Sequence, residues 1–193
     1  MKFAIITISA LFFVLVSFIL IISKNHKHVI TSVNKVSAPI SLNNYLGTNS
    51  SVVFTTYGNL VSDASRTAVR ISVSSANVNI SVLNGYQEKV VKTEDIANNS
   101  DAYKAFLTNL DTNGFLASKS TNLQFSSACP NGETYSLVLN VSGAPLSNLW
   151  DDNCNPGIDG TFKGNGKQNI FDVSTLFQNQ ISNYSDFTAD YVF

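Results

Sequence analysis

The sequence predicts an α+β fold: an N-terminal transmembrane helix, then a small domain with an antiparallel sheet of about five strands and two packed helices. Three observations predict it. Phe3–Ser23 is a run of 21 uncharged residues, short β-branched runs begin at Val52, and apolar residues recur at spacings of three and four within residues 100–110. Because only two helices separate the strands, a doubly wound parallel sheet fits poorly.

Phe3–Ser23 has the length of a membrane-spanning helix. At about 1.5 Å of rise per residue it covers roughly the hydrocarbon thickness of a bilayer. A cleaved signal peptide usually has a shorter apolar region followed by a small-residue cleavage site, and no good site follows this run. We therefore expect residues 1–23 to be an uncleaved, single-pass membrane anchor.

Residues 24–50 are polar and rich in Asn and Ser, which predicts a linker before a domain of residues 51–193. Lys24, Lys27 and Lys35 follow the anchor, and counted alone they favour a cytoplasmic domain. Long domains are translocated with little regard to a few charges, and a cysteine pair favours an oxidising compartment. We expect the domain on the outer side of the cell membrane.

Alternation of apolar and polar residues predicts strands with one face on a core and the other face in water. A turn signal at Asn84-Gly85 and a polar connection at residues 74–77 predict that the first strands form an antiparallel meander. The predicted strands are Val52–Tyr57, Ala68–Val73, Val78–Val82, Tyr135–Val141 and Leu146–Trp150.

Two amphipathic segments predict helices. Residues 100–110 place four apolar side chains on one face, and a helix there can be capped by Asn99 or Ser100 and ended by Asn113-Gly114. The second helix is predicted from about Gln168 to Ser182. The apolar residues expected on the two buried faces are Tyr103, Phe106, Leu107 and Leu110, and Ile170, Val173, Leu176, Phe177 and Ile181.

Cys129 and Cys154 are the only cysteines, 25 positions apart, on either side of the last two predicted strands. A hairpin would bring them together, and a bridge closing such a loop contributes about 3 kcal/mol. Neither has a CxxC partner, so a redox-active dithiol or a zinc ribbon is not indicated. We expect a structural disulfide; two buried free thiols are the alternative.

The stretch Asp151–Asp159 is the strongest candidate for a metal site, because Asp and Asn occupy positions 1, 3, 5 and 9 of a calcium loop. However, Pro156 stands in place of the turn glycine and Phe162 in place of the bidentate glutamate. We interpret the stretch as a solvated turn between strands. Asp151 and Asp152, as neighbours in a strand, would point to opposite faces and would not share a site.

Other patterns exclude further classes of function. Beyond residue 37 the chain has 8 basic and 13 acidic residues, a net charge of −5, which argues against nucleic-acid binding. His26 and His28 are the only histidines and precede the predicted domain, so histidine-based zinc sites or catalysis are not expected in it. Gly160–Lys167 lacks the GxxxxGK[ST] order of a phosphate loop. We predict no cofactor, no metal ion and no catalytic residue.

Several fragments occur in an order that resembles a group of single-span envelope proteins from Saccharibacteria-type bacteria. These fragments are AYKAFLTNLDTNGF, CPNGETY, LWDDNC, GTFKGN and LFQNQI, and the similarity covers about Val52 to Tyr184. The resemblance implies an anchored protein of the cell envelope, with Trp150 beside the cysteine bridge and Phe162 and Phe177 in the core. It implies no activity.

The sequence therefore favours a non-enzymatic, membrane-anchored module that binds a protein or a surface polymer. One alternative is an envelope hydrolase with carboxylates that the sequence does not place. Another is a pilin-like structural subunit, although the chain lacks the Gly-Phe cleavage point and the following Glu of pilins.

Overall fold

The computed structural model describes residues 41–119, 121, 125, 129–154, 160–165 and 169–191. The predicted anchor Phe3–Ser23 and residues 24–40 of the predicted linker lie outside these ranges. None of the helices within them is long and apolar enough to cross a membrane. The linker prediction was wrong at its end, because residues 41–50 belong to the folded domain: Leu42 is fully buried and β1 starts at Ser50.

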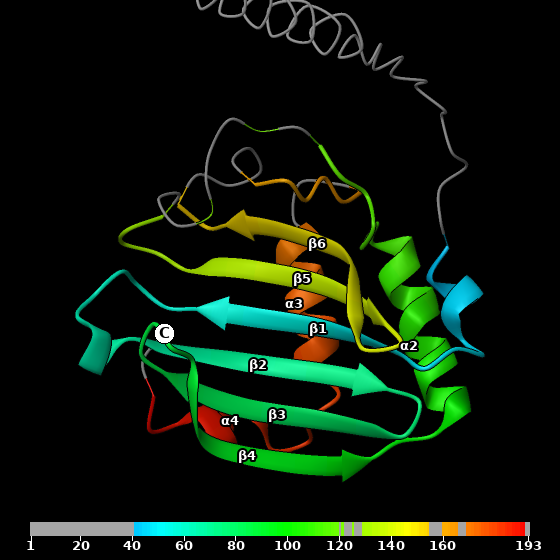
Figure 1. Ribbon diagram of the computed structural model, residues 1–193, viewed down its shortest axis with the longest axis horizontal. Coiled ribbons are helices and arrows are strands. Elements are labelled where there is room, and N and C mark those ends of the chain that lie inside the picture. Colours follow the sequence, from blue (N-terminus) through cyan, green and yellow to red (C-terminus); the bar gives the residue numbers. More distant parts are fainter. Residues whose placement is uncertain are drawn as a thin grey trace, which may run out of the picture. The chain divides into compact units, whose positions relative to one another are not determined.

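The described residues form a six-stranded antiparallel sheet in the order β4-β3-β2-β1-β5-β6 (Figure 1). All five predicted strands are present, and the last of them is longer than predicted. The additional strand is β4, whose lysines and acidic residues hide the alternation expected of a strand. The strands are β1 Ser50–Tyr57, β2 Thr67–Ser74, β3 Asn77–Asn84, β4 Lys89–Ala97, β5 Thr134–Val141 and β6 Ala144–Asp152.

A longer connection, residues 58–66, joins β1 to β2, and tight turns join β2 to β3 and β3 to β4, which completes the predicted meander. At the β3–β4 turn Gly85 has a φ of 73°, a left-handed conformation that glycine adopts without a steric penalty. The chain then passes through a helix before β5 returns beside β1, so that β1 is paired on both sides. β5 and β6 form a second hairpin over Ser142 and Gly143, which both have positive φ as a two-residue type I′ turn requires.

Helix α2, Ser100–Thr112, has the predicted position. The Asn99 side chain accepts hydrogen bonds from the backbone N–H groups of Asp101 and Ala102, which caps the first turn. At the other end Gly114 adopts a φ of 70°. The four apolar residues predicted for its buried face are all buried.

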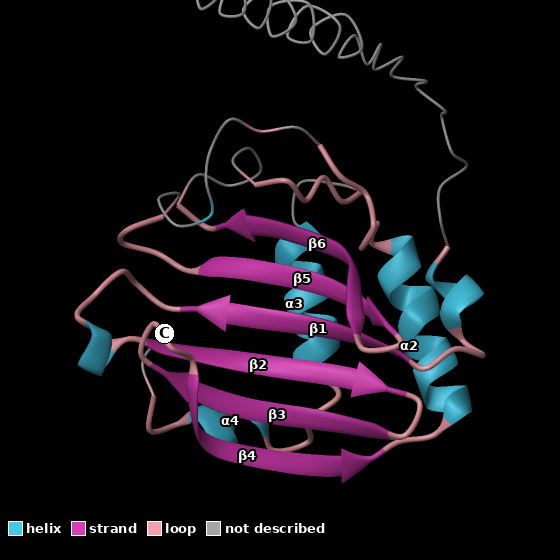
Figure 2. Cartoon of the chain, viewed as in Figure 1, coloured by secondary structure: helices cyan, strands magenta, loops and turns pink. Residues whose placement is uncertain are grey.

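Helix α3, Asn169–Gln178, is shorter than the predicted helix, which extended to Ser182. After Gln178 the α-helical hydrogen bonding gives way to a tighter turn, because the N–H groups of Gln180 and Ile181 bond to the carbonyl groups three residues earlier. A further short helix, α4 Tyr184–Thr188, was not predicted. Figure 2 shows α3 and α4 behind the strands, leaving the front of the central strands without a helix.

The core lies between the helices and the rear face of the sheet, and Phe177 of α3 is at its centre. This side chain is fully buried, and its ring lies 5.2 Å from that of Phe54 on β1 and 5.0 Å from that of Phe106 on α2. Phe115 is the third aromatic neighbour. One side chain therefore joins the sheet to both helices, and Phe162, also expected in the core, is equally buried.

A smaller apolar cluster lies on the front face at one end of the sheet. It contains Tyr57, Ala68 and Leu83, which occupy one cross-strand row, with Phe125 packed against them. The ring of Phe125 also meets Trp150 edge to face. Trp150 thus contacts this cluster and the 160–162 segment described below.

We predict that Phe177→Ala lowers the free energy of unfolding by about 3–5 kcal/mol, because it leaves a cavity where three elements meet. Phe171→Ala is the matched control, since Phe171 on the same helix is 44% exposed. Urea unfolding followed by circular dichroism measures both variants. Equal losses for the two would contradict the central position of Phe177.

Candidate functional site

A disulfide closes one end of the sheet. Cys129 and Cys154 are bonded, with their Cα atoms 5.6 Å apart, so the predicted bridge is confirmed. It ties the segment before β5 to the residue two positions beyond β6. Cys129 is buried and Cys154 is exposed. The Asp152 carboxylate lies within 4.8 Å of both sulfur atoms, which this bond uses, so neither sulfur is a thiolate that could bind a metal ion.

A hydrogen-bonded group of side chains lies beside the bridge. The Tyr135 hydroxyl donates to Glu133 Oε2 at 2.5 Å, and the Asn153 amide donates to the same oxygen at 3.1 Å. Asn153 Oδ1 accepts the backbone N–H of Glu133 at 2.8 Å. Burial and the neighbouring Glu133 carboxylate together raise the pKa of Tyr135 above its ordinary value. The tyrosine therefore stays neutral and holds the carboxylate in place.

Asp151 is the second-last residue of β6, and its side chain is buried, only 6% exposed. The interpretation of this stretch as a solvated turn was therefore wrong for Asp151 and Asp152, because β6 extends through both. Asp151 pairs in register with Tyr135, and Asp152 pairs with Thr134 on the other face, as expected for neighbours in a strand. Their carboxylates do not meet in one site.

The Asp151 carboxylate accepts the backbone N–H groups of Asp152 at 3.1 Å and Gly160 at 3.3 Å. Burial is the main cause that raises the pKa of Asp151, and these two bonds and the charge of Lys119 partly offset it. Asn155 and Asp159, the other oxygen donors of the calcium interpretation, lie outside the described residues. The role that the structure shows for Asp151 is to attach the 160 segment to β6.

Residues 160–162 lie at the outer edge of β6. The Phe162 N–H donates to the Trp150 carbonyl at 2.9 Å, and the Trp150 N–H donates to Thr161 Oγ1 at 3.1 Å. Gly160 lies so close that a Cβ atom there would be 1.9 Å from the Trp150 carbonyl oxygen. These residues extend the sheet, and those of them that are described do not form a phosphate-binding turn.

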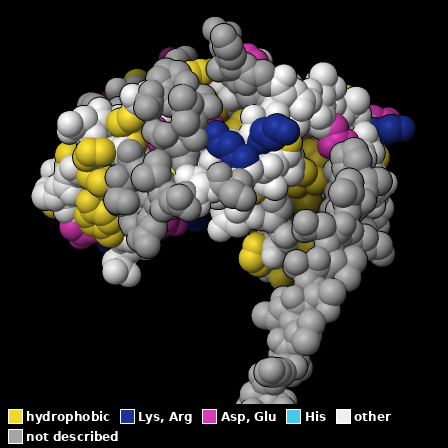
Figure 3. All heavy atoms as spheres, turned by 90° about the horizontal axis from the view of Figure 1, so that it is seen from above, with side chains coloured by type: hydrophobic (Ala, Val, Ile, Leu, Met, Phe, Trp, Pro, Cys, Tyr) yellow, Lys and Arg dark blue, Asp and Glu magenta, His cyan; other side chains and the backbone are white. Residues whose placement is uncertain are grey.

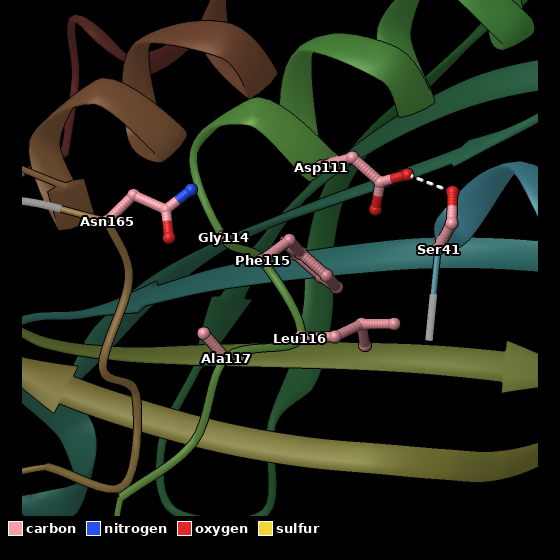
Figure 4. A pocket seen from close by; sticks show the side chains of 7 residues that line it. All are labelled: Ser41, Asp111, Gly114, Phe115, Leu116, Ala117 and Asn165. Atoms are coloured by element: carbon pink, nitrogen blue, oxygen red, sulfur yellow. Dashed lines mark hydrogen bonds between the residues drawn. The ribbon is translucent and has the colours of Figure 1, made fainter. Parts of the chain in front are cut away.

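A half-open pocket of about 450 Å³ lies at the end of α2 (Figure 4). Its single acidic side chain is Asp111, which accepts Ser41 Oγ at 2.5 Å and the Leu42 N–H at 2.8 Å. Asp111 thereby fastens the short 3-10 helix η1, Leu42–Tyr45, to α2. The Asn165 amide donates to the Thr112 carbonyl at 2.6 Å. The polar side chains of the pocket thus stabilise the chain around it, and the remaining lining is apolar.

The front face of the sheet is polar and almost uncharged. Asn79 Nδ2 donates to Thr93 Oγ1 at 3.0 Å and to Asp95 Oδ1 at 3.0 Å, and Ser81 Oγ lies 2.9 Å from Thr93 Oγ1. Arg70 on this face is paired with Glu88. By register and alternation, the front face presents Ser51, Val53, Thr55, Arg70, Ser72, Ser74, Asn77, Asn79, Ser81, Thr93, Asp95, Ser136, Val138 and Asn140.

Two further charged groups hold the β3–β4 turn against this face. Glu88 accepts the Tyr57 hydroxyl at 2.9 Å in addition to its pair with Arg70. Burial first, and then the Glu88 charge, raise the pKa of Tyr57 to about 12. The guanidinium carbon of Arg66 lies 4.2 Å from the centre of the Tyr86 ring. The turn is therefore fixed over the end of the front face.

The sequence had indicated none of these side-chain networks except the bridge. A hairpin separates Asn153 from Glu133 and Tyr135, and 70 positions separate Asp111 from Ser41, so no local spacing indicates that these groups meet. The polar front face, in contrast, was visible as the polar half of each alternating strand. Figure 3, which views the molecule from above and not onto the front face, shows Lys or Arg side chains gathered near the middle of the view and acidic ones scattered among uncharged side chains.

We predict that ionisation of Asp151 destabilises the fold. Because its pKa is higher in the folded than in the unfolded state, the folded protein binds the proton more tightly, and stability falls as the pH rises above about 4. In the Asp151→Asn variant the side chain at this position does not ionise, so this pH dependence is absent. Urea unfolding of both proteins between pH 4 and 8 should show the wild type losing stability relative to the variant as the pH rises. A difference that is constant or grows with pH would contradict this.

We predict that Asp111→Ala lowers the free energy of unfolding by about 1–3 kcal/mol, since the Ser41 hydroxyl and the Leu42 N–H lose their acceptor. Limited proteolysis should then cut more rapidly within residues 41–47. Asn109→Ala, at an exposed position of the same helix, serves as the control. Unchanged cleavage in Asp111→Ala would show that η1 is held by its apolar contacts alone.

The carboxylates of Asp111, Glu133 and Asp151 all accept hydrogen bonds that stabilise the fold. Asp111 is bonded to η1, Glu133 to Tyr135 and Asn153, and Asp151 to the 160 segment. On the front face, by contrast, a network of hydrogen-bonded polar side chains is turned away from the core. No family model, no curated protein and no solved structure matches this chain.

Proposed function

We propose that this protein is a non-enzymatic binding module of the cell envelope. In this proposal Phe3–Ser23 anchors it in the membrane, the domain lies on the outer side, and the front face of the sheet binds an uncharged surface polymer rich in hydroxyl and amide groups. The observation that carries the proposal is the cross-strand network of Ser, Thr and Asn side chains on that face.

Two properties of the face suit such a partner. Its hydroxyl and amide groups both donate and accept hydrogen bonds, so they match sugar hydroxyls and amides without requiring a charge. Bonds such as that between Ser81 and Asn79, at 2.9 Å, already hold these side chains in place. Less rotamer freedom is therefore lost on binding, which favours affinity.

The carboxylates support the same proposal. The pocket beside Asp111 holds one acidic side chain, and that side chain is occupied with η1. A glycosidase needs two facing carboxyl groups, and the Asp111 pocket provides one.

The alternative with a specific observation in its favour is an envelope hydrolase that uses Asp151, because buried carboxyl groups with a raised pKa are frequent in active sites. In that case Asp151→Asn would abolish hydrolysis of envelope material while the protein remained folded. A pilin-like subunit is a further alternative, for which assembly of the purified protein into filaments would be the evidence.

We predict that Ser72→Arg weakens binding of the full chain, in detergent, to immobilised cell-wall polysaccharide. The dissociation constant should rise at least about tenfold. Ser72 lies in the middle row of the front face, opposite Val53 and Asn79, so an arginine there would cover the network. Unfolding should change by less than about 0.5 kcal/mol, as for most surface substitutions.

The control variant is Ala105→Arg, which adds the same side chain to the exposed side of α2. Undiminished binding by Ser72→Arg, or equal loss in both variants, would refute the front face as the binding surface. Retention only by envelope fractions that have not been treated with protease would identify a protein partner instead of a polymer.

A further inference from the structure

The two edges of the sheet are protected differently. At β6 the segment 160–162 covers the end of the strand, and Pro145 near its start has no N–H group to offer to another strand. β4 pairs with β3 on one side, and Figure 1 shows no described segment along its outer edge. An uncovered edge strand presents a row of backbone donors and acceptors to any further strand.

The side chains of β4 do little to block such pairing. Val90 and Val91 are 51% and 48% exposed. A lysine on an edge strand normally discourages pairing, but the Lys92 ammonium donates to the Phe187 carbonyl at 2.7 Å and lies 4.4 Å from the centre of the Phe187 ring. The irregularity in the β3–β4 register falls at Val91, which leaves Lys92–Ala97 in regular register.

From these observations we propose that β4 pairs antiparallel with β4 of a second copy of this chain, so that two sheets join into one. In a symmetric pair a two-fold axis perpendicular to the sheet keeps equal faces on the same side. Because side chains alternate between faces, the axis must then pass beside one residue, which lies opposite its own copy.

Charge selects that residue. An axis at Lys92, Glu94 or Asp95 would place two like charges directly opposite each other, which is unfavourable. Thr93 is the middle residue of the nine-residue strand, so an axis there centres the two strands on each other. The pairing is regular over Lys92–Glu94, and the irregularity at Val91 then lies opposite the partner's Asp95. This axis also places Lys92 opposite the partner's Glu94, and Glu94 opposite the partner's Lys92, which gives two opposite-charge pairs.

The direct test is a cross-link through residue 93. Paired residues in an antiparallel sheet have Cα atoms about 4.5–5.5 Å apart, which suits a disulfide. Thr93→Cys in the full chain, in membranes under mild oxidation, should therefore give a covalent dimer on a non-reducing gel. The native cysteines do not interfere, because both are in the intramolecular bridge.

Asp95→Cys is the matched control, at an exposed position on the same strand and face. In the proposed register its own copy is displaced by four residues, about 13 Å, which is beyond the reach of a disulfide. A Thr93→Cys protein that remains monomeric would overturn the proposal, as would equal cross-linking of the two variants.

The charge pairs provide a second measurement on the same protein. Glu94→Lys should weaken dimerisation of the full chain in detergent roughly tenfold, because each Lys92 then faces a lysine. Asp172→Lys, with the same charge change at an exposed position of α3, should leave it unchanged. Restored dimerisation when Glu94→Lys is mixed with Lys92→Glu would support the register. Equal dimerisation of Glu94→Lys and wild type would refute it.

Discussion

The arrangement of this domain depends on the pairing of β5 with β1. After the β1–β4 meander the chain leaves the sheet, forms α2, and returns to add β5 on the free side of its first strand. Closing so long a connection costs conformational entropy, which must be offset by contacts between segments distant in sequence. Phe177 supplies several of them, because its ring packs against Phe54 of β1 and Phe106 of α2 together.

The same return of the chain creates the polar end of the sheet. The β5–β6 hairpin that this return places beside β1 brings Cys129 and Cys154 within bonding distance and Glu133 next to Asn153. Asp151 then attaches the 160 segment to the outer edge of β6 through the Gly160 N–H. The carboxylates at this end are thus part of the framework. The raised pKa of Asp151 follows mainly from burial in that framework, with a smaller contribution from the charge of the adjacent Asp152.

The two faces of the sheet differ because successive side chains along each strand point to opposite faces. Most rear residues of the strands are apolar and buried beneath the helices. Most front residues are Ser, Thr and Asn, and several of them are hydrogen-bonded to each other across strands. A front face of this kind is stable in water without a covering layer, because its polar groups bond to one another and to solvent. It therefore remains available for a partner, and a second copy joined at β4 would double its extent.

The sequence by itself determined the class of fold, the five alternating strands, the position of α2 and the cysteine bridge, because each depends on local periodicity or on residue chemistry. It did not determine β4, whose charges at Lys89, Lys92 and Glu94 mask its alternation until β3 supplies hydrogen-bond partners. The end of α3 at Gln178, and the docking of residues 41–50, were also decided by packing.

Tertiary structure alone decided which polar residues meet. Asp111 with Ser41, Tyr135 with Glu133 and Asn153, and Asp151 with Gly160 are brought together by strand register and by the return of β5 to β1. The physical reason is that local periodicity specifies which face of an element is buried, whereas long-range pairing specifies which elements share that buried space.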